Sequence, residues 1–278
     1  MPYKTIVVHV SDKRRAESIL APAMQLAAKN NAHLVGLHAY ASMPAPPIPV
    51  PFTSEVLSRI VADVHQNAES IAATFYRLTS GQPFTSEWHL QQLPQTELAS
   101  AVMREGRAAD LIVAGQTDSD WDLSPMLDFP ERLALESGRP VLVIPYVGAY
   151  ENIGRNIVIA WKGSREAARA VFDALPLLEA AENVTILEFK ERGNRSDSLA
   201  PDTSIAAALA RHGIKPVIYS SAAPDIDIGD EILSRLVDLG ADLLVMGAYG
   251  HSRMRELVFG GVTRHIARHM TVPTLFSH

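Results

Sequence analysis

The sequence predicts an α/β fold built from two similar halves, each a parallel sheet covered by helices. Short apolar runs alternate with segments of helical periodicity, and this order restarts after about residue 150. Residues 109–115, ADLIVAG, match residues 241–247, ADLLVMG, 132 positions later, and residues 6–8 match residues 157–159, 151 positions later. Strands and helices that alternate at this length form parallel sheets with helices on both faces.

The elements of the first half follow from apolar runs, caps and breakers. Five strands are expected, over Thr5–Val10, His33–Tyr40, Phe84–Leu90, Leu111–Gly115 and Pro140–Pro145. Four helices are expected, over Arg14–Asn30, from the N-cap Thr53 to about Thr79, over Glu97–Arg107 and over Pro130–Ser137. The proline-rich segment Met43–Phe52 predicts an extended loop: a stiff crossover, a lid over a ligand or a polyproline stretch for a partner.

The second half repeats this order. Its strands are expected over Asn156–Trp161, Asn183–Phe189, Lys215–Ser220, Ala241–Gly247 and Val272–Ser277. Its helices are expected from the N-cap Ser164 to about Ala181, and over Leu199–His212, Ile228–Leu239 and Val262–Met270. We therefore expect two domains, residues 1–148 and 152–278.

Composition limits the classes of function. The 278 residues suffice for two domains of ordinary size. A net charge of −6 argues against a dedicated nucleic-acid binder, and the absence of cysteine excludes disulfides and thiolate metal sites. The chain has no apolar run of about 18 residues and no signal-peptide pattern, so we expect a cytoplasmic protein without a membrane partner.

A glycine-rich loop follows the apolar run Leu243–Met246 and leads into the last helix. Gly247 lets the chain leave the strand tightly, and Gly250, without a Cβ, lets a ligand approach the backbone. Gly260 and Gly261 lie just before the helix, whose free N–H groups and positive end would face an anion. This arrangement suits a phosphate group, although an ordinary loop with glycines for turn geometry is the alternative.

The spacing Gly247-x2-Gly250-x9-Gly260 resembles the nucleotide-binding signature of the universal stress protein family. The repeated Ala-Asp-Leu-x-Val-x-Gly and the Pro-Val and Val-Pro pairs at 140–141 and 272–273 extend the resemblance over nearly the whole chain. It implies two tandem doubly wound domains of five strands each, adenine nucleotide alpha hydrolase-like, paired through their last strands about a pseudo-two-fold axis. It also implies regulatory roles in stress survival and, for some members, binding of ATP or related nucleotides.

Two positions depart from the family pattern. Gly261 stands where Ser or Thr normally follows the last glycine, so backbone donors remain but one hydroxyl is lost. Lys162 stands where an aspartate is expected at the end of the first strand; it could meet phosphate as a point charge or be a solvated surface residue. The nucleotide site that the resemblance implies, with Mg²⁺ accompanying a triphosphate, comprises Gly247, Gly250, Gly260, Gly261, Val262, Thr263 and Lys162.

The first half lacks most of this loop. It retains the exit glycine, Gly115, and offers Asp12 at the end of its first strand. Alignment with the second half places Asp118, Leu127 and Asp128 where the later glycines should be. Because carboxylates repel phosphate and a leucine blocks close backbone approach, we expect at most one nucleotide per chain, in the second half.

Other candidate sites are weaker. His265 and His269 have the i, i+4 spacing of zinc ligands on a helix, but no third ligand of convincing spacing accompanies them, so no metal site is predicted. Asp118, Asp120 and Asp122 alternate, but they lack the later glycine and glutamate of a calcium loop and suit a solvated turn.

The sequence thus leaves two main functions open. The first is a stress-response regulatory protein that binds ATP or a related adenine nucleotide. The second is a structural or interaction protein of the same fold that binds no nucleotide. An enzyme using adenylate chemistry is a weaker third, because no recognisable catalytic motif is present and any ATP hydrolysis should be slow. A protein partner and a homodimer remain open.

Overall fold

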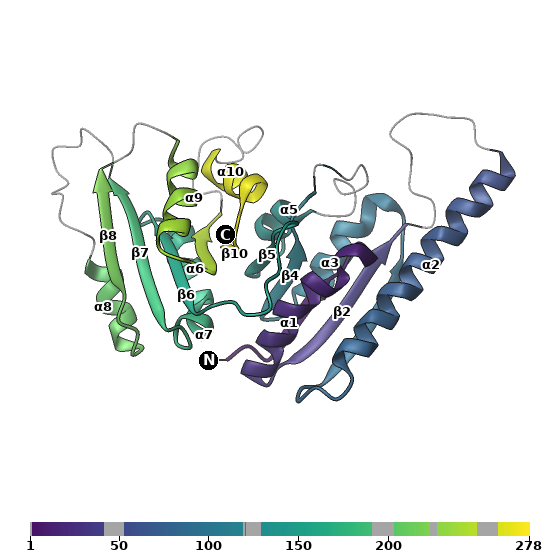
Figure 1. The fold of residues 1–278 in the computed structure, drawn as a ribbon, viewed down its shortest axis with the longest axis horizontal. Coiled ribbons are helices and arrows are strands. Elements are labelled where there is room, and N and C mark those ends of the chain that lie inside the picture. Colours follow the sequence, from purple (N-terminus) through teal and green to yellow (C-terminus); the bar gives the residue numbers. More distant parts are fainter. Residues whose placement is uncertain are drawn as a thin grey trace.

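The protein is a layered α/β structure with one continuous sheet at its centre (Figure 1). The computed structural model describes residues 2–41, 53–118, 120, 129–190, 203–222, 227–248 and 261–278. The predicted loop 43–52 and most of the loop after Gly247 lie outside these residues.

Most strands are apolar runs buried on both faces, whereas the edge strand β3, Ser86–Gln92, is mainly polar. Those of the first half are β1 Thr5–His9, β2 His33–Tyr40, β3 Ser86–Gln92, β4 Leu111–Gly115 and β5 Val141–Ile144. Those of the second half are β6 Asn156–Trp161, β7 Asn183–Lys190, β8 Val217–Ala222, β9 Leu243–Gly247 and β10 Thr274–Ser277. Every residue of β4, β5 and β10 is buried, as expected for central strands covered by helices.

Helices connect the strands. In the first half these are the 3₁₀ turns η1 Lys13–Arg15 and η2 Gln95–Glu97 and the helices α1 Ala16–Asn30, α2 Ser54–Thr79, α3 Leu98–Gly106 and α5 Pro130–Glu136. In the second half they are α6 Arg165–Asp173, α7 Leu175–Leu178, α8 Thr203–Arg211, α9 Ile228–Asp238 and α10 Gly261–His269.

The strand order is β3-β2-β1-β4-β5-β10-β9-β6-β7-β8. All neighbouring strands are parallel except β5 and β10, which meet antiparallel with Leu142 opposite Leu275. A mirrored order around one antiparallel pair is what a two-fold relation between the halves produces. The predicted pairing of the two last strands is confirmed, and each covers the edge that the other would leave open.

Two apolar clusters lie on the two faces of the sheet. One joins the sheet to α1, α2, α6, α7 and α8, with Phe75 and Ile19 among its fully buried side chains. The other joins it to α3, α5, α9 and α10, through residues such as Val102 and Ile266. Helices therefore cover both faces of each half, which confirms the predicted fold class.

The predicted helix from Ser164 to about Ala181 is in fact two helices. Ser164 Oγ accepts a hydrogen bond from Ala167 N (3.2 Å), so the predicted cap is confirmed. α6 nevertheless ends at Asp173, and Pro176 lies in the first turn of α7. Proline lacks an N–H group and clashes with the preceding turn, which explains the break. In contrast, α2 starts after its predicted cap, Thr53, and ends at Thr79 as expected.

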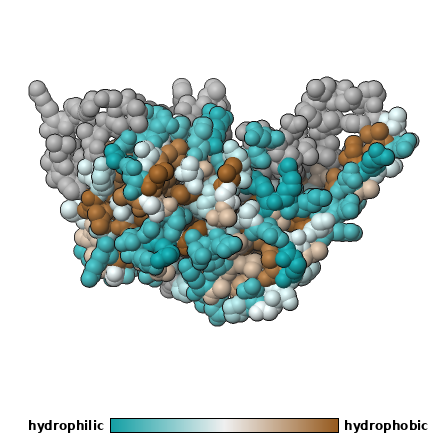
Figure 2. All heavy atoms as spheres, viewed as in Figure 1, coloured by the Kyte–Doolittle hydropathy of each residue, from teal (hydrophilic) through white to brown (hydrophobic). Residues whose placement is uncertain are grey.

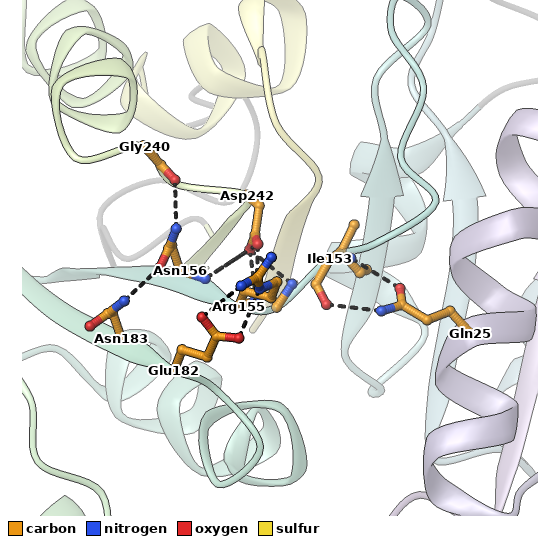
Figure 3. A network of polar contacts seen from close by, with 9 residues as sticks. Gln25, Ile153, Arg155, Asn156, Glu182, Asn183, Gly240 and Asp242 are labelled. Carbon is orange, nitrogen blue, oxygen red and sulfur yellow. Dashed lines mark hydrogen bonds and ion pairs between the residues drawn. The ribbon is translucent and has the colours of Figure 1, made fainter.

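The aspartate of the repeated motif has a structural task in both halves. Asp110 accepts hydrogen bonds from the N–H groups of residues 4–5, at 2.7 and 3.0 Å. Asp242 accepts from the N–H groups of residues 154–156 (Figure 3). These charge-assisted bonds fix the start of β1 beside β4 and the start of β6 beside β9. They lie at the amino ends of the strands, away from the predicted site.

The link between the halves is anchored from both sides (Figure 3). The Gln25 side chain on α1 donates to Ile153 O (3.2 Å) and accepts from Ile153 N (3.0 Å). The next residues belong to the second half, where Arg155 forms two 2.9 Å contacts with Glu182. The linker is thus held to α1 and to the start of β6.

The surface is mainly hydrophilic, with separate apolar patches rather than one continuous area on the face in Figure 2. Exposed large apolar side chains include Val56 and Tyr76 on α2 and Val217 and Tyr219 on the edge strand β8. Among the described residues, no helix combines the length and the apolar character needed to cross a membrane.

Candidate functional site

The candidate site lies at the carboxyl ends of β6 and β9. In the second half the chain order reverses between these two strands, and ligands of open α/β sheets bind outside such a switch point. The register pairs Ala160 with Met246. Lys162, just after β6, and Gly247, the last residue of β9, therefore lie at the same edge of the sheet. The sheet therefore brings together two of the predicted site segments.

Gly247 has a packing role that differs from the one expected. Its backbone is not in the left-handed region, so a tight exit from the strand does not require glycine here. A Cβ at this position would lie 2.5 Å from both Ala167 N and the carbonyl carbon of Glu166. Gly247 is therefore needed because the first turn of α6 packs directly against the end of β9.

The chain after Gly247 stays attached to the last strand. Ala248 N donates to Ser277 O (2.7 Å), and a ring nitrogen of His278 bonds to Ala248 O (2.9 Å). Gly250 and Gly260 lie outside the described residues. The two ends of the glycine loop, at Ala248 and Gly261, are thus defined by the structure.

α10 begins at the carboxyl edge and runs back toward the start of β10. Gly261, its first residue, is exposed, and a Cβ added there would meet no atom within 4 Å among the described residues. Val262 is half-buried and Thr263 is buried. Within the described part of the chain, the first N–H groups of α10 have no intrahelical acceptor and no atom lies close to Gly261, a geometry that suits an anion.

The β6 side of the edge combines an exposed lysine with a buried glutamate. Trp161 is buried in the apolar cluster, as expected for a strand-end tryptophan, and Lys162 is exposed. Burial alone would raise the pKa of Glu166. Hydrogen bonds from its own N–H and from Ser164, with the nearby Arg165 guanidinium, outweigh it and lower that pKa. The carboxylate beside Gly247 is therefore ionised at neutral pH.

In the first half, a side chain occupies the corresponding edge. Arg15 is buried, and its Nη1 and Nη2 donate to Gln116 O (2.7 Å) and Ile144 O (3.4 Å). A Cβ on Gly115 would lie 2.7 Å from Nη2 of Arg15. The exit glycine of the first half therefore makes room for a guanidinium group.

Gln116, the residue after β4, connects the two halves. Its Nε2 donates to Ala267 O and Arg268 O, both at 3.0 Å, and its Oε1 accepts from Tyr146 N at 3.0 Å. These bonds satisfy carbonyls in the last turn of α10, where intrahelical donors are missing. This residue supports α10 from the opposite half.

The acidic residues of the first half take part in local turns. Asp12 Oδ1 accepts from Arg14 N (3.2 Å), and its other oxygen pairs with the Arg14 guanidinium. Asp118 Oδ1 accepts from Asp120 N (2.9 Å), in agreement with the predicted turn. Residues 127–128 lie outside the described part of the chain. The absence of a nucleotide from this half stays a prediction.

Two buried histidines in the first half were not expected from the sequence. His9 on β1 stacks on Phe129, and burial together with the nearby His38 lowers the pKa of His9 to about 3. His38 on β2 bonds through Nδ1 to Val10 O (2.7 Å), and burial lowers its pKa as well. The position of His9 inside the apolar run of β1 was the one signal available. Both are neutral core residues at physiological pH.

Known proteins resemble this chain at two levels. Residues 154–278 match the model of the universal stress protein family. A 38-residue segment is 50% identical to universal stress protein Slr1230 of Synechocystis, covering 14% of this chain and 13% of that relative. The chain therefore aligns with only a small part of that relative's length.

Solved structures extend the likeness to the whole fold. A universal stress protein from Archaeoglobus fulgidus has a TM-score of 0.67 at 14% identity, covering 98% of this chain and 95% of that one. A protein of unknown function from Pseudomonas aeruginosa has a TM-score of 0.62 at 14% identity, covering 99% and 92%. At this identity the likeness concerns the fold alone.

Proposed function

Because residues 154–278 match the model of the universal stress protein family and the whole chain shares its fold with a solved member, we propose a stress-response regulatory protein that binds an adenine nucleotide. The nucleotide is ATP or a close relative, with Mg²⁺ accompanying a triphosphate. It binds at the carboxyl edge of the second of two domains, residues 1–148 and 152–278.

One observation carries the proposal: the exposed start of α10 beside open space at a topological switch point. No described atom would lie within 4 Å of a Cβ on Gly261, and the N–H groups of Gly261 and Val262 have no carbonyl within the helix to bond to. The partial positive charge at a helix start adds a favourable interaction with phosphate. The backbone alone can therefore hold an anion, even without the hydroxyl that the family pattern has.

The other predicted residues have distinct tasks in this proposal. Gly250 and Gly260 let the loop backbone approach the phosphates, and Lys162 supplies a point charge from the opposite strand. Gly247 acts indirectly, because its contact with α6 fixes where the loop leaves β9. Thr263 is buried one turn into α10 and supports the helix start.

A second candidate function is a structural or interaction protein that binds no nucleotide. The observation that favours it is Glu166, a buried and ionised carboxylate whose main chain contacts Gly247. A negative charge near the site disfavours phosphate. The two candidates differ in a titration with ATP. The first predicts binding that changes with the residue at position 261, and the second predicts no binding.

Gly261→Glu and Gly261→Ser test the proposal. Both side chains fit the open space, and an acidic residue in the first turn stabilises a helix by about 0.3–1 kcal/mol, so folding is preserved. In calorimetric titrations with ATP and Mg²⁺, we expect the glutamate to weaken binding at least tenfold by repelling phosphate. The serine restores a hydroxyl donor and should strengthen binding.

Two outcomes would reject the nucleotide proposal in different ways. If the wild-type protein shows no binding at millimolar ATP, the second candidate is correct. If Gly261→Glu binds ATP as well as the wild type does, the nucleotide lies elsewhere on the chain.

A further inference from the structure

A group of potential metal ligands gathers where α9 and α10 lie side by side (Figure 1). Asp227 is the N-cap of α9, Asp230 lies in its first turn, and His265 lies on α10. One ligand atom from each of these three residues lies within 4.8 Å of the other two. We call this group the His–Asp cluster. It gives His265 two carboxylate neighbours that the sequence alone did not show, in place of His269.

The contact between His265 and Asp230 is close but is not a hydrogen bond. Nε2 of His265 lies 2.8 Å from Oδ1 of Asp230, yet it is shielded from solvent and has no aligned hydrogen-bond partner among the described residues. An imidazole nitrogen carries either an N–H or a lone pair, and in both cases it points outward in the plane of the ring. Among the described residues no acceptor is aligned with that direction, so the Nε2 lone pair is available to a metal ion that the two carboxylates would also contact.

The backbone is shaped to bring the imidazole close to α9. A Cβ on Gly229 would lie 2.6 Å from Cδ2 of His265 and 2.9 Å from Oδ1 of Asp227. Asp227 Oδ1 accepts from Gly229 N (2.7 Å), which holds that carboxylate over the first turn of α9. Any residue larger than glycine at 229 would push His265 away from the two carboxylates.

We propose that the His–Asp cluster binds Zn²⁺ through His265, Asp230 and Asp227. One imidazole and two carboxylates form a mixed nitrogen and oxygen set that suits zinc, whose bonds to such ligands are about 2.0–2.2 Å. Tetrahedral coordination separates ligand atoms by roughly 3.3 Å, so the cluster needs only small side-chain movements. Water fills the fourth position.

The surrounding charges permit a cation here. The positive start of α9 opposes it with roughly half a charge, while Asp227 and Asp230 supply two negative charges. Glu231 is paired with Arg235 at 2.8 Å, so the charge of that arginine is balanced within α9. The ring of His269 packs against that of His265 in a tilted arrangement, with centroids 4.5 Å apart, and its Nδ1 bonds to His265 O (3.0 Å). This neighbour fixes the ring of the zinc ligand.

The site is independent of the proposed nucleotide and its Mg²⁺. Its ligands come from α9 and the middle of α10, and none of them belongs to the glycine loop. Zinc binding is therefore measured on the full chain without nucleotide, and its failure would leave the nucleotide proposal untouched.

The test is a competition titration of Zn²⁺ against a chromophoric chelator, using untagged protein. We expect one Zn²⁺ per chain, with affinity at least tenfold weaker in His265→Gln and in Asp230→Asn. Asp227 is left intact because it caps α9. The matched control is His212→Gln, which removes another histidine beside a carboxylate, Glu179 at 3.9 Å, and should bind zinc like the wild type.

Cobalt substitution gives an independent readout. Co²⁺ in the wild-type protein should show the intense visible absorption of a tetrahedral site, and this absorption should be lost in His265→Gln. No saturable zinc binding, or equal binding by all three variants and the wild type, would overturn the proposal. In that case the His–Asp cluster is an ion pair only, and Asp230→Asn alters stability without altering zinc affinity.

Discussion

The two halves close the same strand ends in opposite ways. Arg15 and Glu166 are equivalent positions, 151 residues apart, and both lie against the exit glycine of their half. In the first half, the guanidinium of Arg15 fills the space beside Gly115 and bonds to carbonyls. In the second half, the backbone of α6 fills the space beside Gly247. A side chain packs against the glycine of the first half, and main-chain atoms pack against the glycine of the second half.

The helix that follows shows the same contrast. α5 begins with Pro130, which is buried and has no N–H group to offer. α10 begins with Gly261, which is exposed and has no described atom close to where a Cβ would lie. The two halves thus share their strands and their aspartate anchors but differ in the residue that begins this helix.

The largest expected difference between the halves is sensitivity to acid. His9 is buried with a pKa of about 3, while its equivalent in the second half is Ala160, which does not titrate. Below pH 6.5 the unfolded chain binds a proton at His9 that the folded chain excludes, so stability falls as pH falls. The loss is ~1.4 kcal/mol per pH unit and reaches ~3 kcal/mol at pH 4.

His9→Leu should remove this part of the pH dependence. The measurement is the free energy of unfolding from urea titrations between pH 7 and pH 4, for variant and wild type. The difference between the two curves is the signal, since other groups titrate in both proteins. Parallel curves would mean that His9 takes up its proton in the folded protein over the same pH range as in the unfolded protein.

Substituting alanine for Gly115 and for Gly247 compares the cost of a clash with a side chain to the cost of a clash with the backbone. At Gly247 the new Cβ would meet backbone atoms of α6 at 2.5 Å, which cannot move without shifting the helix. At Gly115 it would meet the end of Arg15 at 2.7 Å and Cδ1 of Ile19 at 3.0 Å, side-chain atoms that can shift more easily than a helix backbone. We expect Gly247→Ala to cost about 3 kcal/mol and Gly115→Ala about 1 kcal/mol, measured by urea unfolding. Equal costs would contradict this account of the two edges.

Gln116→Ala should have a smaller effect, confined to the support that the first half gives to α10. It removes bonds to the carbonyls of Ala267 and Arg268, which we expect to cost ~1–2 kcal/mol. Hydrogen exchange should become faster in the last turn of α10 and stay unchanged in α1. Unchanged exchange throughout α10 would show that the bridge does not stabilise that helix.

Local signals predicted much of the fold. Thr53 fixed the start of α2, and the repeated aspartate motif identified equivalent strands in the two halves. Pro176 is the local signal for the break between α6 and α7, where apolar periodicity alone predicts one continuous helix. Glycine spacing predicted the edge of the sheet where the candidate site lies.

Other features depend on contacts between distant residues. Arg15 reaches carbonyls of residues 116 and 144, and no local pattern indicates that a charged side chain should be buried there. His265 meets Asp230 across two helices, so the sequence showed only the histidine pair on α10. The packing role of Gly247 likewise becomes visible only when α6 is placed against β9.

The most direct test of the central claim is to map where a photoreactive azido-ATP attaches to the full chain. Labelling with Mg²⁺ present, followed by proteolysis and mass spectrometry, assigns the label to a half. We expect all label that excess ATP competes away to lie within residues 154–278. Competable label within residues 1–148, or no competable label at all, would contradict a single nucleotide site in the second half.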